Sequence, residues 1–377
     1  MSENSSEVKE KTLSAEELNS LSEHRVRGKD EPPDPKYLLE VRHLCKYFPL
    51  GANFFGKPTS YLRAVDDISF GIERGKTIGV VGESGCGKSV TAMSILGLVS
   101  EPGEIMPGSK IVYMGNVDRD EDGLNLATAT DEQIRHIRGN EISMIFQEPM
   151  SSLNPVITVG DQIMENILTH EEVSKEEAKQ RAIDLLAEVG ISRPEKVVDN
   201  YPFQLSGGMC QRVMIAMALS CHPKLLIADE PTTALDVTIQ AQILSLMNRL
   251  KNETGTSIML ITHDLGVVAQ VADNVNVMYA GKVVETAPVE ELFNNPKHPY
   301  TIGLMNSMPS LAEEGKRLNT IEGSVPNPLY LPKGCYFADR CPYVTDRCKE
   351  GQPVDTKVKS RHHVWCFKVE EEMKQEG

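Results

Sequence analysis

Apolar and polar residues form blocks along the chain that predict strands followed by helices. Short, nearly continuous apolar runs predict buried strands at Thr77–Val81, Leu225–Ala228 and Ser257–Ile261. Helix-compatible runs follow two of these strands, at Val90–Leu98 and Val237–Leu250. Alternating strands and helices of this kind are typical of an α/β protein with a parallel sheet.

Other stretches predict additions to this core. Further short strands, and a hairpin around Ala280-Gly281, are predicted at Leu38–Leu44, Ala64–Ile72, Lys110–Met114, Ile142–Phe146, Val275–Met278 and Lys282–Glu285. A loop rich in Gly and Pro, from Pro49 to Ser60, separates the first two of these strands. From about Thr158 to Gly190 the apolar spacing becomes helical, and this stretch predicts a helical insertion between two strands.

Composition limits the classes of protein to consider. The chain has 377 residues, 40% of them hydrophobic, and a net charge of −15. This length suffices for two domains, and such acidity disfavours general binding to nucleic acid or anionic lipid. Residues 1–36 are polar, end in a Pro-rich stretch and predict a disordered tail without the pattern of a signal peptide. No apolar run approaches the roughly 18 residues of a membrane span, so we expect a cytosolic protein.

A glycine-rich turn between the strand Thr77–Val81 and its helix has the spacing of a phosphate-binding loop. Its residues are Gly82, Glu83, Ser84, Gly85, Cys86, Gly87, Lys88 and Ser89. The glycines let several backbone N–H groups point inward, and the following helix N-terminus adds to this anion site. Lys88 can reach the terminal phosphates of a nucleotide, and the Ser89 hydroxyl can ligate Mg²⁺.

Polar side chains follow three of the predicted strands. Gln147 comes after Ile142–Phe146, Asp229 and Glu230 end the strand that begins at Leu225, and His263 follows Ser257–Ile261. Ligands of open α/β sheets bind at the carboxyl ends of the strands. Asp229 can hold the Mg²⁺ shell, and Glu230 can polarise a water for attack on a γ-phosphate. A polar turn residue is the alternative for Gln147, and a structural role is the alternative for His263.

Two further features allow both a functional and a structural interpretation. Ser206, Gly207 and Gly208 open a helical stretch and form a second potential anion site, although Ser-Gly turns are also common helix caps. Tyr47 and Phe48 follow the first predicted strand. Either aromatic ring could stack on a purine or pack in the core.

Together these segments resemble one family. The loop Gly82–Ser89, Gln147, Leu205–Met209, Leu225–Glu230, Ala234-Leu235-Asp236 and His263 are similar to the six motifs of an ABC transporter ATPase, in the same order. The resemblance implies a P-loop ABC ATPase fold, with a RecA-like core, an antiparallel β subdomain and a helical subdomain. It predicts a nucleotide-binding domain at 37–297, with its helical subdomain at about 148–222, and a small Cys-rich domain at 298–377. Met209 departs from the Gln that is usual in the signature motif.

The resemblance also implies residue roles. ATP and Mg²⁺ are the expected ligands, with Ser89, Gln147 and Asp229 around Mg²⁺ and Val90 beside the phosphate loop. Phe48 matches the aromatic residue that stacks on adenine, with Tyr47 as the second choice. Glu230 is the expected base, Lys88, Gln147 and His263 assist it, and Asp236 belongs to the D-loop. Ser206, Gly207 and Gly208 of one chain are expected to meet the γ-phosphate bound by another, so the resemblance implies a dimer.

The branch of the family is indicated by longer segments. Residues 147–155, 229–238, 298–301 and 323–328 resemble importers of oligopeptides and dipeptides. The implied partners are two transmembrane permeases, a sister ATPase or a second copy of this chain, and indirectly an extracytoplasmic substrate-binding protein, at the cytoplasmic face of the membrane. Oligosaccharide or nickel are alternative cargoes. A soluble ABC ATPase acting on ribosomes or DNA, or a cassette that only binds nucleotide, is the alternative function.

Four of the eight cysteines gather near the C-terminus, at Cys335, Cys341, Cys348 and Cys366. Their spacing indicates Zn²⁺ or an iron–sulfur cluster, with His362 and His363 as spare ligands. The family resemblance favours a [4Fe–4S] cluster. Cys86 lies at a helix N-terminus, which lowers the pKa of a thiol, so we also expect alkylation there that ATP blocks.

Overall fold

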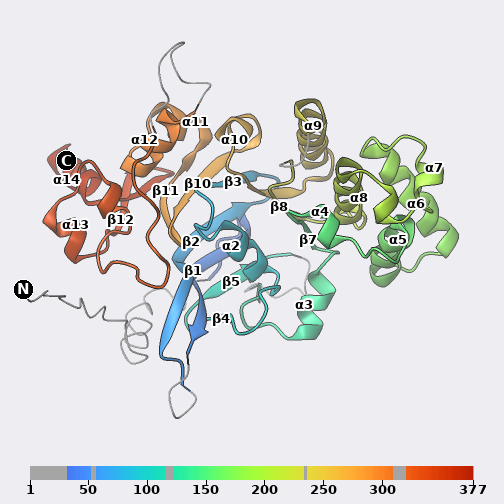
Figure 1. The fold of residues 1–377 in the computed structure, drawn as a ribbon, viewed down its shortest axis with the longest axis horizontal. Coiled ribbons are helices and arrows are strands. Elements are labelled where there is room, and N and C mark those ends of the chain that lie inside the picture. The colour runs from blue at the N-terminus through green and yellow to red at the C-terminus, as the bar shows by residue number, and fades with distance from the viewer. Residues whose placement is uncertain (1–31, 52–56, 116–122, 233–235, 309–319, 377) are drawn as a thin grey trace, which may run out of the picture.

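The computed structural model describes residues 32–51, 57–115, 123–232, 236–308 and 320–376. Most of the predicted N-terminal tail and the centre of the 51–60 loop lie outside these residues. Two sheets and a group of helices make up the described parts (Figure 1). Among the described residues, no helix combines the length and apolarity needed to cross a membrane.

The larger sheet has eight strands in the order β12-β13-β11-β10-β3-β9-β8-β7. Its five parallel strands are β3 (Thr77–Val81), β7 (Ile142–Ile145), β8 (Leu225–Asp229), β9 (Ser257–Ile261) and β10 (Asn274–Tyr279). Nearly all their residues are buried, as expected for strands covered on both faces. The predicted α/β class with a parallel core is confirmed.

The second sheet is antiparallel. It consists of β1 (Tyr37–Leu50), β2 (Ser60–Glu73), β5 (Lys110–Tyr113) and β6 (Leu124–Asn125), with β4 (Glu104–Ile105) paired to β1. Strand β1 is longer than the sequence predicts. Phe48 therefore lies inside the strand, directly opposite Leu62 of β2.

Helices follow the strands of the parallel sheet. They are α2 (Lys88–Ile95) after β3, α9 (Val237–Thr254) after β8 and α10 (Leu265–Val271) after β9. Helix α3 (Asp131–Ile137) follows β6 of the antiparallel sheet and precedes β7. Helix α9 begins at an Asp236 side chain that accepts a hydrogen bond from the Ile239 N–H, at 3.0 Å. It ends at Gly255, whose φ of 73° suits a helix C-terminus.

The predicted helical insertion comprises short helices that pack on one apolar cluster. Those in the cluster are α5 (Val159–His170), α6 (Lys175–Glu188), α7 (Pro194–Val197) and α8 (Gly207–Leu219), and α4 (Pro149–Ser152) contacts α8. The hydroxyls of Thr158 and Ser174 cap α5 and α6. These helices lie at the opposite end of the molecule from the C-terminal helices (Figure 1).

The C-terminal region continues the large sheet. It contains β11 (Lys282–Pro288), α11 (Val289–Asn294), α12 (Pro299–Asn306), α13 (Asp346–Glu350), β12 (Asp355–Lys359), β13 (His362–Trp365) and α14 (Phe367–Glu376). Strand β13 pairs with β11, with Val364 opposite Glu285. Apolar residues on both sides of residue 297 share one core cluster. The chain on both sides of the boundary expected at 297 thus contributes to one packed core.

Candidate nucleotide site and cysteine cavity

The phosphate loop connects β3 to α2 through backbone conformations that only glycine adopts easily. Gly82 has a φ of 150° and Gly87 a φ of 100°. A Cβ atom on Gly82 would lie 2.1 Å from the Met278 carbonyl oxygen, and one on Gly87 would lie 2.5 Å from that of Ala64. The loop is thus packed against neighbouring strands, and its shape depends on these two glycines.

A cavity of about 390 Å³ opens beside this loop. Its walls come from the phosphate loop, the β2 strand, the turn after β10 and a C-terminal segment. The lining residues are Leu62, Arg63, Ala64, Ser84, Gly85, Gly87, Lys88, Ser89, Val90, Gln147, Glu230, Ala280, Gly281, Val325, Pro326, Asn327, Pro328 and Leu331. Most of the predicted phosphate-site residues therefore meet in one place.

The side chain of Lys88 is held by the first residues of the phosphate loop. Its ammonium donates hydrogen bonds to the carbonyl oxygens of Gly82, at 2.9 Å, and Glu83, at 3.1 Å. The side chain is 6% exposed, and it lines the cavity. A positive charge beside inward-pointing backbone amides is suited to bind a polyphosphate.

Glu230 lies at the centre of a polar group at the end of the parallel strands. The amide of Gln147 donates to one carboxylate oxygen at 3.3 Å, and Nδ1 of His263 lies 3.3 Å from the other. Glu230 has a left-handed φ of 48°, while its N–H still bonds to the Ile261 carbonyl at 2.9 Å. The carboxylate is therefore held from two sides beside the cavity.

Asp229 precedes Glu230 and is almost completely buried. Its Oδ1 atom has no hydrogen-bond partner among the described residues. Burial raises the pKa of its carboxyl, while a hydrogen bond from Ser89 and the charge of Lys88 oppose that change. A buried carboxylate oxygen without a partner, next to a serine hydroxyl, fits the coordination shell of Mg²⁺.

The signature residues lie outside this cavity. Ser206 and Gly207 are exposed at the N-terminus of α8, where the Ser206 hydroxyl accepts a hydrogen bond from the Met209 N–H at 3.4 Å. Gly208 is half-buried. None of the three lines the cavity formed by their own chain.

Two sequence interpretations need correction. Tyr47 is only 3% exposed, and its hydroxyl bonds to the Asp66 carboxylate, so its ring is packed in the core and is not available to stack on a base. Phe48 is half-buried next to Leu62, which lines the cavity. Cys86 is fully buried, and burial raises the pKa of its thiol, which contradicts the predicted reactive cysteine.

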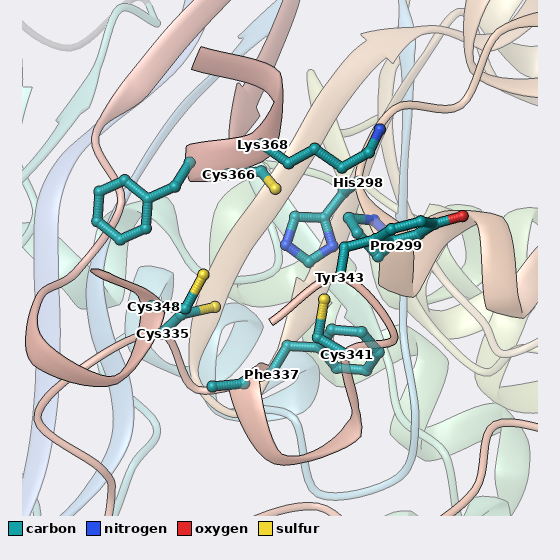
Figure 2. Close-up of a pocket in the computed structure, with 11 residues that line it drawn as sticks. His298, Pro299, Cys335, Phe337, Cys341, Tyr343, Cys348, Cys366 and Lys368 are labelled. Atoms are coloured by element: carbon teal, nitrogen blue, oxygen red, sulfur yellow. The ribbon is translucent and has the colours of Figure 1, made fainter. Parts of the chain in front are cut away.

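The four C-terminal cysteines surround a second, much smaller cavity of about 20 Å³ (Figure 2). Their sulfur atoms point toward a common space, and the ring of His298 lies beside it. Burial and the neighbouring thiolates raise the pKa of the Cys335 thiol to about 12. Four thiols in such a space would ionise together only with a compensating cation.

The histidines expected as spare ligands are bound elsewhere. Nε2 of His362 lies 2.7 Å from the Glu285 carboxylate, and both side chains are fully buried. His363 pairs with Asp355 at 3.0 Å. Instead, His298 lines the thiol cavity, which the sequence interpretation missed because it considered only the residues between the cysteines. Within the described ranges, no group of three or more His, Cys, Asp or Glu side chains is arranged so that it could hold a metal ion.

The parallel sheet and the loop at Lys88 define a P-loop nucleotide-binding protein. Residues 65–233 match the family described as ABC transporter, and residues 284–348 match the C-terminal region of oligopeptide/dipeptide transporters. The oligopeptide transport ATP-binding protein AppD of Bacillus subtilis (strain 168) is 54% identical over 336 residues, covering 89% of this chain and 98% of that protein. The chain belongs to the ABC transporter ATP-binding family.

Two other relatives agree with this assignment. The dipeptide transport ATP-binding protein DppD of Escherichia coli (strain K12) is 49% identical over 299 residues, which are 79% of this chain and 89% of DppD. Among solved structures, cbiO1 of Clostridium perfringens, part of the ABC transporter complex cbiONQ, has a TM-score of 0.53 at 26% identity. The structural match covers 69% of this chain and 92% of cbiO1. The expected ABC ATPase fold is thus confirmed.

Proposed function

We propose that this chain is the ATP-hydrolysing subunit of an importer of di- or oligopeptides. The observation that carries the proposal is the single cavity that joins Lys88 and Ser89 of the phosphate loop to Gln147 and Glu230 of the strand ends. The relatives AppD and DppD are named as peptide-transport ATP-binding proteins, and the match at 284–348 is specific to that branch. Oligosaccharide or nickel import is the alternative cargo assignment, and a non-transport ATPase is a more distant one.

The chain's own residues suggest the chemical steps. Lys88 and the loop amides bind the phosphates, and Ser89, Gln147 and Asp229 would hold Mg²⁺, which neutralises charge on the β- and γ-phosphates. Glu230 accepts a proton from the attacking water. Gln147 and His263 hold the two oxygens of that carboxylate, so that it faces the cavity.

The exposed signature residues suggest how two chains cooperate. We infer that Ser206, Gly207 and Gly208 of one chain complete the phosphate site at Lys88 of another, with Asp236 near the contact. The partner ATPase is a second copy or a sister subunit. In the proposed complex the pair lies at the cytoplasmic face of the membrane against two permeases, and a substrate-binding protein delivers cargo on the other side.

A glutamine at position 230 tests the proposed base. Glu230→Gln keeps the size of the side chain and removes its charge, so turnover should fall about 10²- to 10⁴-fold. MgATP binding should persist, because the phosphate loop is unchanged. The matched control is Glu172→Gln on the exposed surface of the helical insertion, which should hydrolyse ATP at the parent rate. Parent-level hydrolysis by Glu230→Gln would remove Glu230 from the mechanism.

For the cysteine cavity we propose a structural [4Fe–4S] cluster on Cys335, Cys341, Cys348 and Cys366. Its support is the convergence of the four thiols on one space, together with the resemblance of these cysteine positions to those of the importer branch. A polynuclear cluster separates its cysteine ligands more widely than one tetrahedral Zn²⁺ does.

Metal analysis separates the two kinds of centre. Protein purified without oxygen should be brown and contain about four iron and four sulfide per chain. A colourless protein with one zinc per chain would establish the alternative. Cys335→Ala should lose the iron, whereas Cys221→Ala, a buried cysteine in the helical insertion, should retain it.

A further inference from the structure

One wall of the nucleotide cavity contains no residue to which we assigned a part in phosphate binding or hydrolysis. Val325, Pro326, Asn327, Pro328 and Leu331 line it, although they lie more than 230 residues beyond the phosphate loop. We propose that these five lining residues form the adenosine-binding wall of this site and set its affinity for the nucleoside part of the ligand. This inference rests on the proposed nucleotide site at Lys88.

The position of the wall follows from the orientation of the cavity. Its phosphate end is defined by Lys88 and Ser89, with Gln147 and Glu230 beside them. The sugar and base of a nucleotide bound there must extend away from that end. The surfaces left to meet them are residues 62–64 of β2, the turn at Ala280-Gly281 and the segment 325–331.

The chemistry of the segment suits a nucleoside. Val325, Pro326, Pro328 and Leu331 are apolar, and apolar or ring-shaped side chains pack well on the faces of a purine. Asn327 adds an amide, which can both donate and accept hydrogen bonds. A mostly apolar wall with one or two placed polar groups is typical of small-molecule sites.

The segment is shaped by its own hydrogen bonds. The Asn327 side-chain oxygen accepts from the Leu329 N–H at 3.0 Å, and its carbonyl accepts from the Tyr330 N–H at 2.9 Å. Val325 and Leu331 pack on the apolar cluster of the C-terminal region. The wall is therefore an ordered turn anchored at both ends.

Arg340 connects this wall to the phosphate loop. Its guanidinium donates to the carbonyl oxygens of Ile321, at 3.1 Å, and Glu322, at 2.9 Å, just before the segment. The same group forms an ion pair with Glu83 of the phosphate loop at 2.9 Å. One side chain thus fixes the distance between the two surfaces that would hold the nucleoside and the phosphates.

Two ligands separate the wall from the phosphate site. MgATP carries a nucleoside, and magnesium tripolyphosphate does not. Asn327→Ala should raise the Kd for MgATP about tenfold, measured by calorimetry, and leave the Kd for tripolyphosphate unchanged. Leu329→Ala is the matched control, because Leu329 lies in the same turn, is exposed and does not line the cavity; it should alter neither Kd. Lys88→Ala should weaken both ligands.

A fluorescence measurement tests for contact with the nucleoside in a way that does not depend on loss of affinity, which a folding defect could also cause. Tryptophan introduced by Pro328→Trp should change its emission on adding MgATP but not tripolyphosphate, while Leu329→Trp should respond to neither. The signal of Trp365, the one native tryptophan, is subtracted using the parent protein.

Several results would overturn the inference. One is an unchanged Kd for MgATP in Asn327→Ala, and another is an equal increase in the Kd for MgATP and for tripolyphosphate. A third is tryptophan emission from Pro328→Trp that does not change when MgATP is added. If the parent itself bound no MgATP, the proposed ATPase function would fall and this inference with it. If the parent bound MgATP and only the wall variants gave the wrong result, the proposed ATPase function would stand.

Discussion

Glu230 shows how one backbone conformation places a reactive side chain. The residue leaves the end of β8 with a left-handed φ of 48°, an uncommon conformation for a non-glycine residue that is often found where function requires it. Its carboxylate then lies between Gln147 and His263. The strain at this position is offset by the buried strand on which it is built, since Leu225–Asp229 is buried along its whole length.

Cys86 leads to a prediction at the same scale. The thiol is fully buried, and burial raises its pKa, so little thiolate is exposed at neutral pH. In native protein, iodoacetamide should label Cys86 to no more than a few per cent of the level reached in denaturant. MgATP should make no difference. Peptide mass spectrometry measures this, and rapid native labelling of Cys86 would show that the phosphate loop opens.

The outcomes at Glu230, Tyr47 and Cys86 show what could be predicted for single residues. Polar residues directly after apolar strands, such as Glu230, could be placed at one sheet edge because parallel strands share that edge. Burial of Tyr47 and Cys86 could not be predicted, because it depends on Asp66 and on an apolar cluster that includes Met278, neither of which is a sequence neighbour.

At the scale of elements, the short 3-10 turn Ala338–Arg340 is the link between the cysteine region and the phosphate loop. Arg340 is 6% exposed in its side chain, and Glu83 is 28% exposed. A double-mutant cycle with Arg340→Ala and Glu83→Gln should give a coupling free energy of about 1 kcal/mol for MgATP binding. Arg347→Ala, which breaks ion pairs with the outer helix α14, is the control and should leave binding unchanged. Additive effects of the two changes would show that the ion pair between Arg340 and Glu83 does not contribute to MgATP binding.

A second prediction at this scale concerns the ion pair between Glu291 of α11 and Lys359 of β12. Ion pairing with Lys359, with a further hydrogen bond from Asn295, lowers the pKa of Glu291 from 4.5 to about 2. A carboxylate with a lowered pKa in the folded state stabilises the protein above pH 4.5, and this contribution is lost as the pH falls toward 2. Glu291→Gln should therefore lower the urea midpoint at pH 7 slightly and have less effect at pH 3. Glu290→Gln, at an exposed neighbouring position, should have no such pH dependence.

The elements of the parallel core were predicted almost residue by residue. Strands β3 and β9 have the expected bounds, because continuous apolar runs flanked by polar turns leave few alternatives. Strand β12 was not predicted. Its sequence, Asp355–Lys359, is mostly charged and exposed, and only pairing with β13 reveals it as a strand.

For the whole molecule, the exposed signature turn at Ser206 and the cavity at Lys88 predict a complementation. Neither Lys88→Ala nor Ser206→Arg should hydrolyse ATP alone, because one lacks the phosphate site and the other blocks the surface offered to a partner. Mixed in equal amounts, the two variants should recover part of the parent activity, since each mixed pair contains one intact composite site. Parent protein diluted with Lys88→Ala is the control for subunit exchange. An inactive mixture, with exchange demonstrated, would contradict a composite site formed between two copies of this chain.

The sheet that passes from β10 through β11 into β13 has a practical consequence for anyone who shortens the protein. A version ending at residue 297 would lack β13, and with it the strand pairing that places Val364 and His363 opposite Glu285 and Thr286. An edge strand that loses its neighbour pairs readily with strands of other chains. Such a fragment should therefore precipitate during purification, although its phosphate loop is complete.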